Sequence, residues 1–278
     1  MKYRPIFGCL VFVCMVLGFM GCGGVISPVK WEAPLNPGYE GVYAKNDILK
    51  DIEQVHVGQE EEGLESVAVD GMGRIYLSAT ARGKILRMEP DGSGLSVWAD
   101  TGGRPLGMAF DKSGNLIVAD AFRGLLSVSP DAVVTELASE ADGIPIRYAD
   151  DVDVATDGTI YFTDASTKFG AKAFGGTLEA CTLDTLEHGG YGRLLCYHPE
   201  TGQTETLLSG LYFANGVAVS HDQQCVLVSE TTNYRIVRYW TAGEKKGQSD
   251  YILHELPGFP DNITNKDRSC VATILSGG

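Results

Sequence analysis

A hairpin pattern that recurs along the chain constrains its fold more than any other feature. In the stretch from Arg147 to Asp164, RYADDVDVATDGTIYFTD, two runs of alternating apolar residues flank the turn Asp157-Gly158. Alternation with a period of two predicts a strand with one buried face, and Asp-Gly between two such runs predicts a tight β-hairpin. The same pattern recurs at residues 67–78, 108–120 and 217–230.

Each hairpin is followed by a third apolar run and then by a shorter fourth one. Four antiparallel strands per repeat define a propeller blade. The turn glycines Gly73, Gly114 and Gly158 are 41 and 44 residues apart, close to the ~40–50 residues of propeller repeats. Gln223 takes this place in the fourth repeat. The sequence therefore predicts an all-β fold, a β-propeller of four-stranded antiparallel blades.

The spacing of the later repeats is irregular. An insertion at residues 169–191 delays the fourth repeat and lacks strand alternation. We expect it to contain a short helix or lid over one propeller face, with a surface loop of no special role as the alternative. A fifth repeat begins near Asp261 and breaks off within the blade. We expect the propeller to occupy residues 61–278 and to be incomplete, because an open ring leaves strand edges unpaired.

The first 24 residues have the pattern of a targeting segment. Lys2 and Arg4 precede an apolar run at residues 6–20, which is short for a helix spanning about 30 Å of hydrocarbon. The small residues around Cys22 resemble a bacterial lipobox. Two interpretations stay open, a lipoprotein anchored through Cys22 and an uncleaved signal anchor, and both predict an exported, envelope-anchored protein. The Pro-rich residues 25–60 are expected to be a lead-in to the propeller.

Composition disfavours several classes of function. The net charge is −14, which argues against nucleic-acid binding because phosphate recognition needs a basic face. The cysteines beyond the targeting segment lack the C-x-x-C spacing of zinc or iron–sulfur sites, so Cys196 and Cys225 are interpreted as buried free thiols. The five histidines lie in linker, turn or outer-strand contexts, and no Ser-His-Asp triad is predicted.

Polar side chains recur at one position of the repeat. Counting eight residues back from each turn position gives Glu65, Leu106, Asp150 and Asn215, and Asp261 takes the matching place in the fifth repeat. The innermost strands of a propeller line its axis, so these side chains are expected to converge in the central channel. The alternative is that each one only hydrogen-bonds its own turn.

We call the four oxygen-bearing residues of this set, Glu65, Asp150, Asn215 and Asp261, the axial ring. Carboxylate and amide oxygens without histidine or cysteine favour a hard cation, Ca²⁺ or alternatively Mg²⁺ or Mn²⁺, over zinc. Three clustered carboxylates would repel one another, and some would stay protonated without a cation. The sequence therefore predicts a divalent metal site on the axis.

Three charged residues next to this ring are secondary candidates. Asp151 should point away from the axis along its strand, supporting the ligands without binding the ion. Arg104 and Arg147 precede first strands on the same side. Both are candidates to bind substrate anions, and salt bridges to nearby acids are the equal alternative.

Taken together, several long motifs resemble those of a known family. GRPLGMAFDKSGNLIVADAFRGLLSVSP, DDVDVATDGTIYFTDAS, GRLLCYHPETG, LYFANGVAVS and ELPGFPDNI resemble strictosidine synthase-like proteins. The resemblance is closest to the adipocyte plasma membrane-associated protein branch, itself similar to the gluconolactonase and paraoxonase propellers. It covers roughly residues 26–265 and implies a six-bladed propeller.

The resemblance also implies roles for the axial ring. In gluconolactonase-like relatives the axial metal is held by a Glu, an Asn of an N-D pair, an Asn of an N-G pair and an Asp of a P-D motif. Glu65, Asp150, Asn215 and Asp261 match these positions. Asp150 departs from the pattern, where Asn is usual, and adds a negative charge. True strictosidine synthases use a Glu of a sixth blade that this sequence does not contain.

These observations lead to one expected function and two alternatives. We expect a calcium-dependent hydrolase that takes a small-molecule ester or lactone, with Asp261 or Asp150 activating water as general base. The first alternative is a non-catalytic propeller in which the metal is a structural pin and the surface a binding platform. The second is a Pictet–Spengler-type strictosidine synthase. A membrane is expected as a partner only through the N-terminal anchor.

Overall fold

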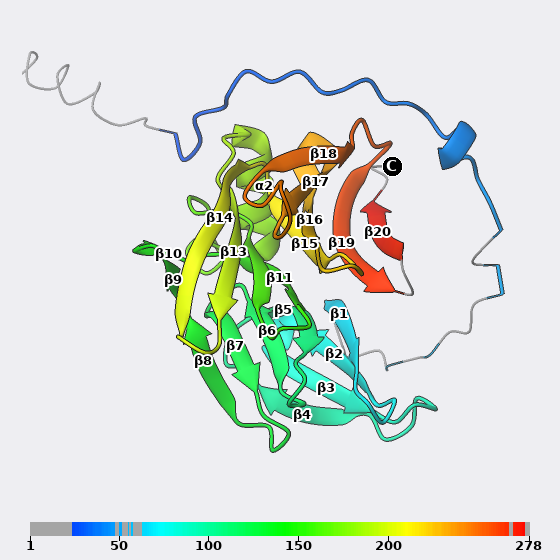
Figure 1. The fold of residues 1–278 in the computed structure, drawn as a ribbon, viewed down its shortest axis with the longest axis vertical. Helices are drawn as coiled ribbons and strands as arrows, with labels where there is room; N and C mark the ends of the chain where they lie inside the picture. Colours follow the sequence, from blue (N-terminus) through cyan, green and yellow to red (C-terminus); the bar gives the residue numbers. More distant parts are fainter. Residues whose placement is uncertain are drawn as a thin grey trace, which may run out of the picture.

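The repeats fold into separate antiparallel sheets arranged around a common axis (Figure 1). The computed structural model describes residues 24–47, 50–51, 55, 57, 63–266 and 269–275. Within these residues, four four-stranded sheets each take their strands in chain order, and the fifth repeat forms a two-stranded sheet. The prediction of an all-β propeller with four-stranded blades is confirmed.

The strands match the predicted runs closely. Blades one and two contain β1 (Leu64–Val69), β2 (Ile75–Ala79), β3 (Lys84–Met88), β4 (Ser96–Asp100), β5 (Pro105–Phe110), β6 (Leu116–Asp120), β7 (Gly124–Val128) and β8 (Val134–Ala138). Blades three and four contain β11 (Ala149–Val154), β12 (Ile160–Asp164), β13 (Gly192–His198), β14 (Gln203–Leu211), β15 (Ala214–Val219), β16 (Cys225–Glu230), β17 (Arg235–Trp240) and β18 (Ser249–Leu253). The fifth repeat contains β19 (Phe259–Lys266) and β20 (Ser269–Leu275).

The remaining described elements are short. A small hairpin of β9 (Glu140–Ala141) and β10 (Ile144–Pro145) follows blade two. Three 3₁₀ helices cover η1 (Gly41–Tyr43), η2 (Thr80–Arg82) and η3 (Thr231–Asn233), and the insertion holds the α-helix α2 (Thr177–Glu187).

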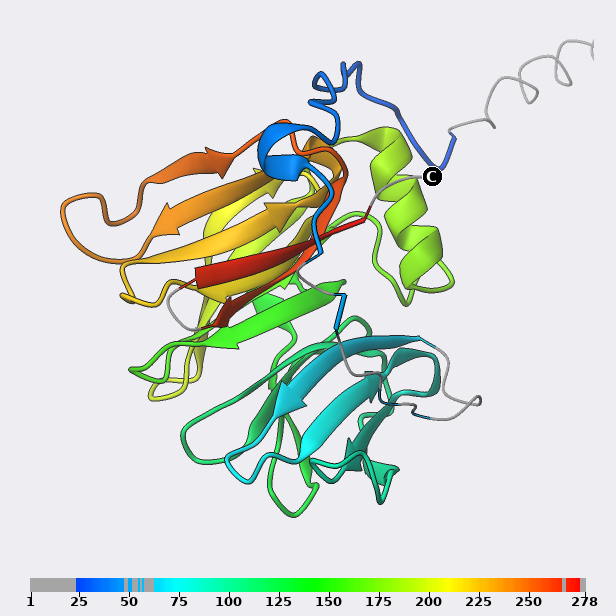
Figure 2. The ribbon, with the colours of Figure 1, turned by 90° about the vertical axis from the view of Figure 1, so that its right-hand side faces the viewer.

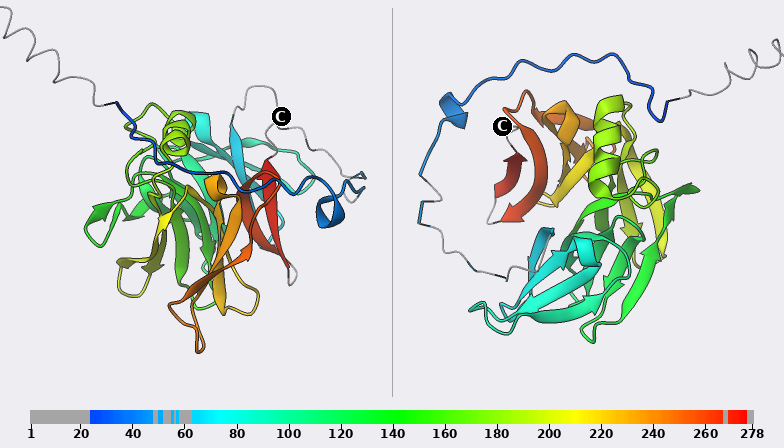
Figure 3. Two further views of the ribbon diagram at one scale, coloured as in Figure 1. Left: turned by 90° about the horizontal axis from the view of Figure 1, so that it is seen from above. Right: turned by 180° about the vertical axis from the view of Figure 1, so that it is seen from behind.

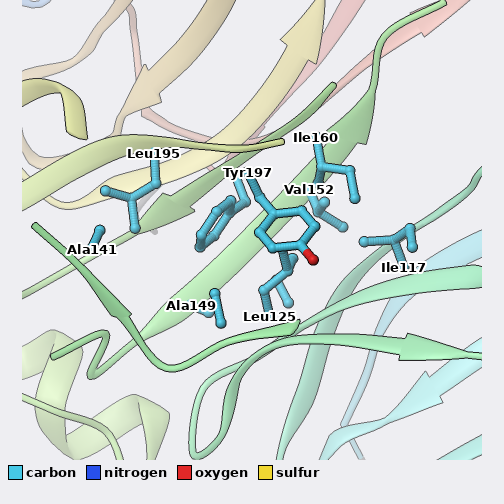
Figure 4. Close-up of a cluster of buried hydrophobic side chains, with 11 residues drawn as sticks. Ile117, Leu125, Ala141, Ala149, Val152, Ile160, Leu195 and Tyr197 are labelled. Carbon is cyan, nitrogen blue, oxygen red and sulfur yellow. The ribbon is translucent and has the colours of Figure 1, made fainter. Parts of the chain in front are cut away.

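Neighbouring blades pack through the apolar faces that the alternation predicts. Between blades two and three, Ile117 and Leu125 meet Val152, Leu195 and Tyr197 in one buried cluster (Figure 4). Alternation along β13 places Leu195 and Tyr197 on the face that points into this cluster. The intervening residues of β13 therefore face blade four.

Every innermost strand is interrupted at the same place. In each blade, the register between the innermost strand and the second strand shifts, and two residues of the innermost strand lie at the shift. The shifts lie between Leu64 and Val67, Pro105 and Met108, Ala149 and Val152, Ala214 and Val217, and Pro260 and Ile263. Such a bulge twists a strand locally and re-aims its side chains. The axial positions Glu65, Leu106, Asp150, Asn215 and Asp261 are each the first of the two residues at such a shift. The bulge therefore orients these side chains towards the axis.

The insertion covers one end of the ring. α2 stands where the innermost strands begin, across the strand ends in Figure 2. The Tyr148 hydroxyl donates to the Thr177 carbonyl over 3.0 Å, and Arg104 Nε donates to Thr177 Oγ1 over 3.0 Å. Both donors directly precede innermost strands, so the first residue of α2 is tied to blades two and three.

The described part of the lead-in, drawn in blue, runs from α2 around the outside of the fourth and fifth blades (Figure 3). The backbone N–H of Val29 donates to the Glu187 carbonyl over 2.8 Å. The Trp31 ring lies 4.2 Å from that of His188, and Tyr43 packs on the apolar cluster of blades four and five. These contacts attach the lead-in to the propeller.

Residues 1–23 of the predicted targeting segment, including Cys22, lie outside the described residues. Among the helices that the structure does describe, none combines the length and the apolar content needed to cross a membrane. Lipidation of Cys22 and a signal anchor therefore stay predictions.

Candidate metal centre

The four axial-ring residues come together from four different blades. Asn215 Nδ2 donates to Asp261 Oδ1 over 2.7 Å, which joins blades four and five. Asn262 Nδ2 lies 3.4 Å from Glu65 Oε1, which brings the fifth repeat next to blade one. The charges of Glu65 and Asp261 both act on Asp150. The repeat offset thus predicts a real spatial cluster.

The acids of the ring raise one another's pKa. Asp150 is 4% exposed, and its pKa lies well above the usual range because of burial first and the charges of Glu65 and Asp261 next. Burial also raises the pKa of Asp261, against the hydrogen bond from Asn215. These carboxylates therefore need either protons or a cation to coexist.

Glu65 is the most accessible member of the ring. Surrounding protein and then the Asp261 charge raise its pKa, whereas Asn262 and Arg104 lower it. Its side chain is nevertheless exposed. Water at this exposed side chain screens the charges that act on it.

An amide oxygen in the ring favours a cation over protons. Asn215 is 7% exposed, and its Oδ1 has no hydrogen-bond partner among the described residues. A buried amide oxygen without a hydrogen-bond donor destabilises the fold by about 1–3 kcal/mol. A proton shared among the carboxylates removes this cost only if it points at the amide oxygen. Three carboxylates and one free amide oxygen are the donor types that Ca²⁺ prefers. The residues present therefore fit a hard divalent cation.

The axial position of blade two carries an apolar side chain. Leu106 is buried in blade two with Tyr148, Phe169 and Phe213, beneath α2. Cys181 of α2 lies near enough to Asp150 and Asp261 for their charges to act on it, and burial, the main cause, raises its pKa to about 12. The space above the axial ring is thus bounded by apolar side chains and a neutral thiol.

Asp151 connects blades rather than standing free behind the ring. Its Oδ2 accepts from the Val217 N–H over 2.9 Å, and its Oδ1 accepts from the Val152 N–H over 2.9 Å. A Cβ on Gly107 would lie 2.2 Å from Asp151 Oδ1, so only glycine permits this approach. Asp151 therefore holds β11 against β15, which supports the ring indirectly.

A cavity of about 380 Å³ follows the axis from the ring along the innermost strands. Glu65, Asp151, Asp153 and Asn262 contribute its polar lining. Asp151 was expected to point away from the axis, but it borders this cavity. Burial raises its pKa to about 7, while its two backbone hydrogen bonds act in the opposite direction.

The two candidate substrate-binding arginines differ. Arg104 is half-buried, its side chain donates to Thr177, and its charge acts on Glu65. Arg147 is exposed, and its backbone N–H donates to Asp164 Oδ1 over 3.2 Å. Arg104 therefore belongs to the wall of the site, whereas the exposed side chain of Arg147 lies beside Gly170.

Acids that end the second strand of three blades position the site and were not singled out from the sequence. Asp120 accepts from the Arg104 N–H, Asp164 from the Tyr148 N–H and Glu230 from the Tyr212 N–H, over 2.8–2.9 Å. Each bond fixes the segment that leads into an innermost strand. The signal was present in the sequence, because the hairpin motifs of these blades all end in an acid.

The fold and the ring define the protein class, a β-propeller with a candidate metal centre on its axis. Comparisons with known proteins narrow this class. The family model for strictosidine synthase matches residues 150–244, and the model for the strictosidine synthase-like N-terminal region matches residues 41–88. Together with the relatives below, these matches identify the chain as a member of the strictosidine synthase-like family.

Two curated relatives illustrate the match. Protein STRICTOSIDINE SYNTHASE-LIKE 7 of Arabidopsis thaliana is 45% identical over 167 residues, which cover 60% of this chain and 42% of that protein. The adipocyte plasma membrane-associated protein of Salmo salar is 34% identical over 275 residues, which cover 92% of this chain and 63% of that protein. The chain thus spans about half the length of the curated relatives it matches.

A solved structure shares the fold. The gluconolactonase from Xanthomonas campestris superposes with a TM-score of 0.62 at 19% identity, covering 78% of each chain. At this identity the similarity shows the propeller architecture alone.

Proposed function

We propose that this propeller is a calcium-dependent hydrolase of small lactones or esters. The observation that carries the proposal is the buried, unpartnered Oδ1 of Asn215 beside the carboxylates of the axial ring. The similar solved structure is that of a gluconolactonase, which supports a lactone as the substrate class. The departure of Asp150 from the usual Asn is compatible with this role, because a carboxylate also supplies an oxygen ligand.

Glu65, Asp150, Asn215 and Asp261 would hold the Ca²⁺ ion. When bound there, Ca²⁺ supplies Lewis-acid stabilisation of negative charge on a substrate carbonyl oxygen. The protein's own contribution is to hold four oxygens from four blades in one place. The bulges and the terminal acids of the second strands provide that positioning.

Asp261 is the better placed of the two candidate general bases. It is half-buried, and its neighbour Asn262 lines the axial cavity, whereas Asp150 is almost fully buried. Asn215 holds its Oδ1, and we assign Oδ2 to accept the proton of the attacking water. Asp150 then remains a ligand and takes no proton during turnover.

The surroundings of the ring suit a small, partly apolar substrate. Leu106, Tyr148 and Phe213 form the apolar wall beneath α2. Arg104, anchored to Thr177, adds a positive charge on the Glu65 side. Apolar ring carbons would lie against the wall, and Arg104 would orient the carboxylate that forms as the acyl bond breaks.

The N-terminal segment supports a location at the cell envelope. We propose export and anchoring through Cys22 or through an uncleaved signal, in line with the membrane association named for one relative. Mass spectrometry of the membrane fraction would detect a diacylglyceryl group on Cys22. A mature protein that begins after residue 22 would contradict anchoring.

Hydrolysis of phenyl acetate and of a panel of γ- and δ-lactones tests the proposal. We expect turnover that is lost in a calcium chelator, restored by added Ca²⁺ and lost in Asp261→Asn. The control is Asp222→Asn, which changes an acid in an exposed turn of blade four. Turnover that resists the chelator would contradict the metal role. A Ca²⁺-dependent rise in melting temperature without turnover on any substrate would instead favour the structural pin.

A further inference from the structure

A second cluster of metal-ligand side chains lies far from the axis, on the outer hairpin of blade three. Cys196 and His198 are two residues apart on β13, so they share one face of the sheet. Glu205 of β14 pairs with Cys196 in the strand register, and directly opposed residues also share a face. A sulfur, an imidazole and a carboxylate are therefore side by side. We call these three residues the rim cluster.

The rim cluster faces blade four. Leu195 and Tyr197 point from the other face of β13 into the cluster shared with blade two (Figure 4). Tyr161 of β12 pairs with Cys196 on the opposite side from Glu205. Cys196 is 2% exposed, whereas the side chains of His198 and Glu205 are 41% and 53% exposed. The cluster thus has a buried sulfur at its base and an opening to solvent.

The distances within the rim cluster suit one small ion. His198 Nε2 lies 3.5 Å from Cys196 Sγ and 3.0 Å from Glu205 Oε1. All three ligand atoms lie within 4.8 Å of one another. Bond lengths of about 2.0–2.3 Å in a tetrahedral zinc site place ligand atoms roughly 3.3–3.8 Å apart. The two distances from His198 Nε2 lie close to this range.

An acid and a cavity lie beside the rim cluster. A cavity of about 320 Å³ is lined by His198, Asp157 and Gln203, among others. Asp157 lines this cavity with His198, and its charge acts on Cys196. Burial, followed by the charges of Glu205 and Asp157, raises the pKa of the Cys196 thiol to about 12. The environment is therefore negative, and it leaves room for a fourth ligand from solvent.

We propose that Cys196, His198 and Glu205 form a binding site for Zn²⁺ or a similar borderline transition metal, separate from the axial ring. Mixed sulfur, nitrogen and oxygen ligands select such ions over Ca²⁺ and Mg²⁺. Three protein ligands leave a fourth position towards the cavity. The two centres of this chain therefore bind different classes of metal.

Cobalt spectroscopy on the untagged protein tests the site. Co²⁺ is titrated in excess Ca²⁺, so that the axial ring is saturated. We expect one equivalent to bind with a near-ultraviolet thiolate-to-cobalt charge-transfer band, which Zn²⁺ then displaces. Cys196→Ser should abolish the band, and His198→Gln should weaken Zn²⁺ binding at least about 100-fold.

Matched variants separate the site from general effects. Cys225→Ser removes another buried free thiol, on β16 of blade four, and should leave the band unchanged. Glu205→Gln changes a half-exposed side chain, so it should fold normally and weaken Zn²⁺ binding about 10-fold. A folded wild type without the band, or a band that persists in Cys196→Ser, would overturn the proposal. Zn²⁺ binding that does not saturate below millimolar concentrations would overturn it as well.

Discussion

The axial ring and the rim cluster are both small groups of potential ligands, but they are assembled in opposite ways. The ring draws four oxygens from the innermost strands of four blades, with partners such as Asn215 and Asp261 that are 46 residues apart. The rim cluster draws three residues from a single hairpin, with His198 and Glu205 only 7 residues apart. The ring therefore depends on the packing of the whole propeller, and the rim cluster depends on one local register.

This difference shows how the assembly of a site affects the types of ligand that it contains. Positions on an axis are repeated, so one kind of ligand can return from blade to blade, and here four of the five axial positions carry oxygen. A single hairpin brings neighbouring positions together without closing a long loop. These positions are not related by the repeat, so their side chains can be of different types, here sulfur, nitrogen and oxygen ligands. Changes at the ring should disturb activity and blade packing together, whereas changes at the rim should act locally.

Replacing Asp150 should give the largest effect. Asp150→Leu copies the residue of blade two into the ring, removes one of its oxygens, and should lower ester or lactone turnover about 1,000-fold. Asp150→Asn keeps an oxygen, and its turnover should stay within about tenfold of wild type. Steady-state kinetics with added Ca²⁺ measure both. Equal loss in the two variants would show that charge, rather than coordination, is required at this position.

The tie between blades three and four should dominate stability. Asp151→Ala leaves the N–H groups of Val152 and Val217 without their acceptor and should lower the free energy of unfolding by about 3 kcal/mol. Glu205→Ala at the rim should cost about 0.5 kcal/mol or less, because its pairing is half-exposed. Urea denaturation compares them. Similar losses at the two positions would remove the contrast between cross-blade and local assembly.

Two metals should stabilise the protein independently. Each ion at 100 times its Kd should add about 2.7 kcal/mol to the free energy of unfolding. Because the two centres share no residues, the Ca²⁺ and Zn²⁺ increments should add in thermal melts. Cys196→Ser should remove only the Zn²⁺ increment. Strong non-additivity would mean that both ions compete for one centre.

The smallest expected effect concerns an acid that belongs to neither centre. Asp184 of α2 is buried and accepts from Ser166 Oγ over 2.6 Å, and burial raises its pKa to about 6. The unfolded chain loses this proton near the ordinary value of 3.8. Wild-type stability should therefore fall as pH rises from about 4 to 6, because the unfolded state releases the proton first.

Asp184→Asn should remove that fall. The variant should be about 1–2 kcal/mol more stable than wild type at pH 7 and similar to it near pH 4. Chemical denaturation at a series of pH values provides the comparison. Parallel pH profiles for the two proteins would show that the pKa of Asp184 is the same in the folded and unfolded states.

The sequence predicts the axial ring better than the rim cluster for a physical reason. The ring follows from a repeat offset, and side-chain periodicity reports which positions share a face. Asp151 illustrates the limit, because only the structure shows that it reaches the Val217 N–H across a blade boundary. Arg104 is similar, since its contact with Thr177 depends on how the insertion folds.

The rim cluster shows a different limit. Cys196 is a buried free thiol, as predicted. The sequence places His198 two residues away, but only the β13–β14 register brings Glu205 opposite Cys196. Register is set by the length and geometry of the connecting turn, and spacing rules for cysteine motifs do not include it.

The shared bulge of the innermost strands has a consequence for how such a ring can vary. The innermost strands of all five described repeats carry the same register shift. The backbone therefore provides five equivalent axial positions, whichever side chain each one carries. Leu106 occupies one of these axial positions without contributing a ligand. A single substitution at one of these positions can therefore add a ligand, remove one or change its charge, while the strand pairing stays the same.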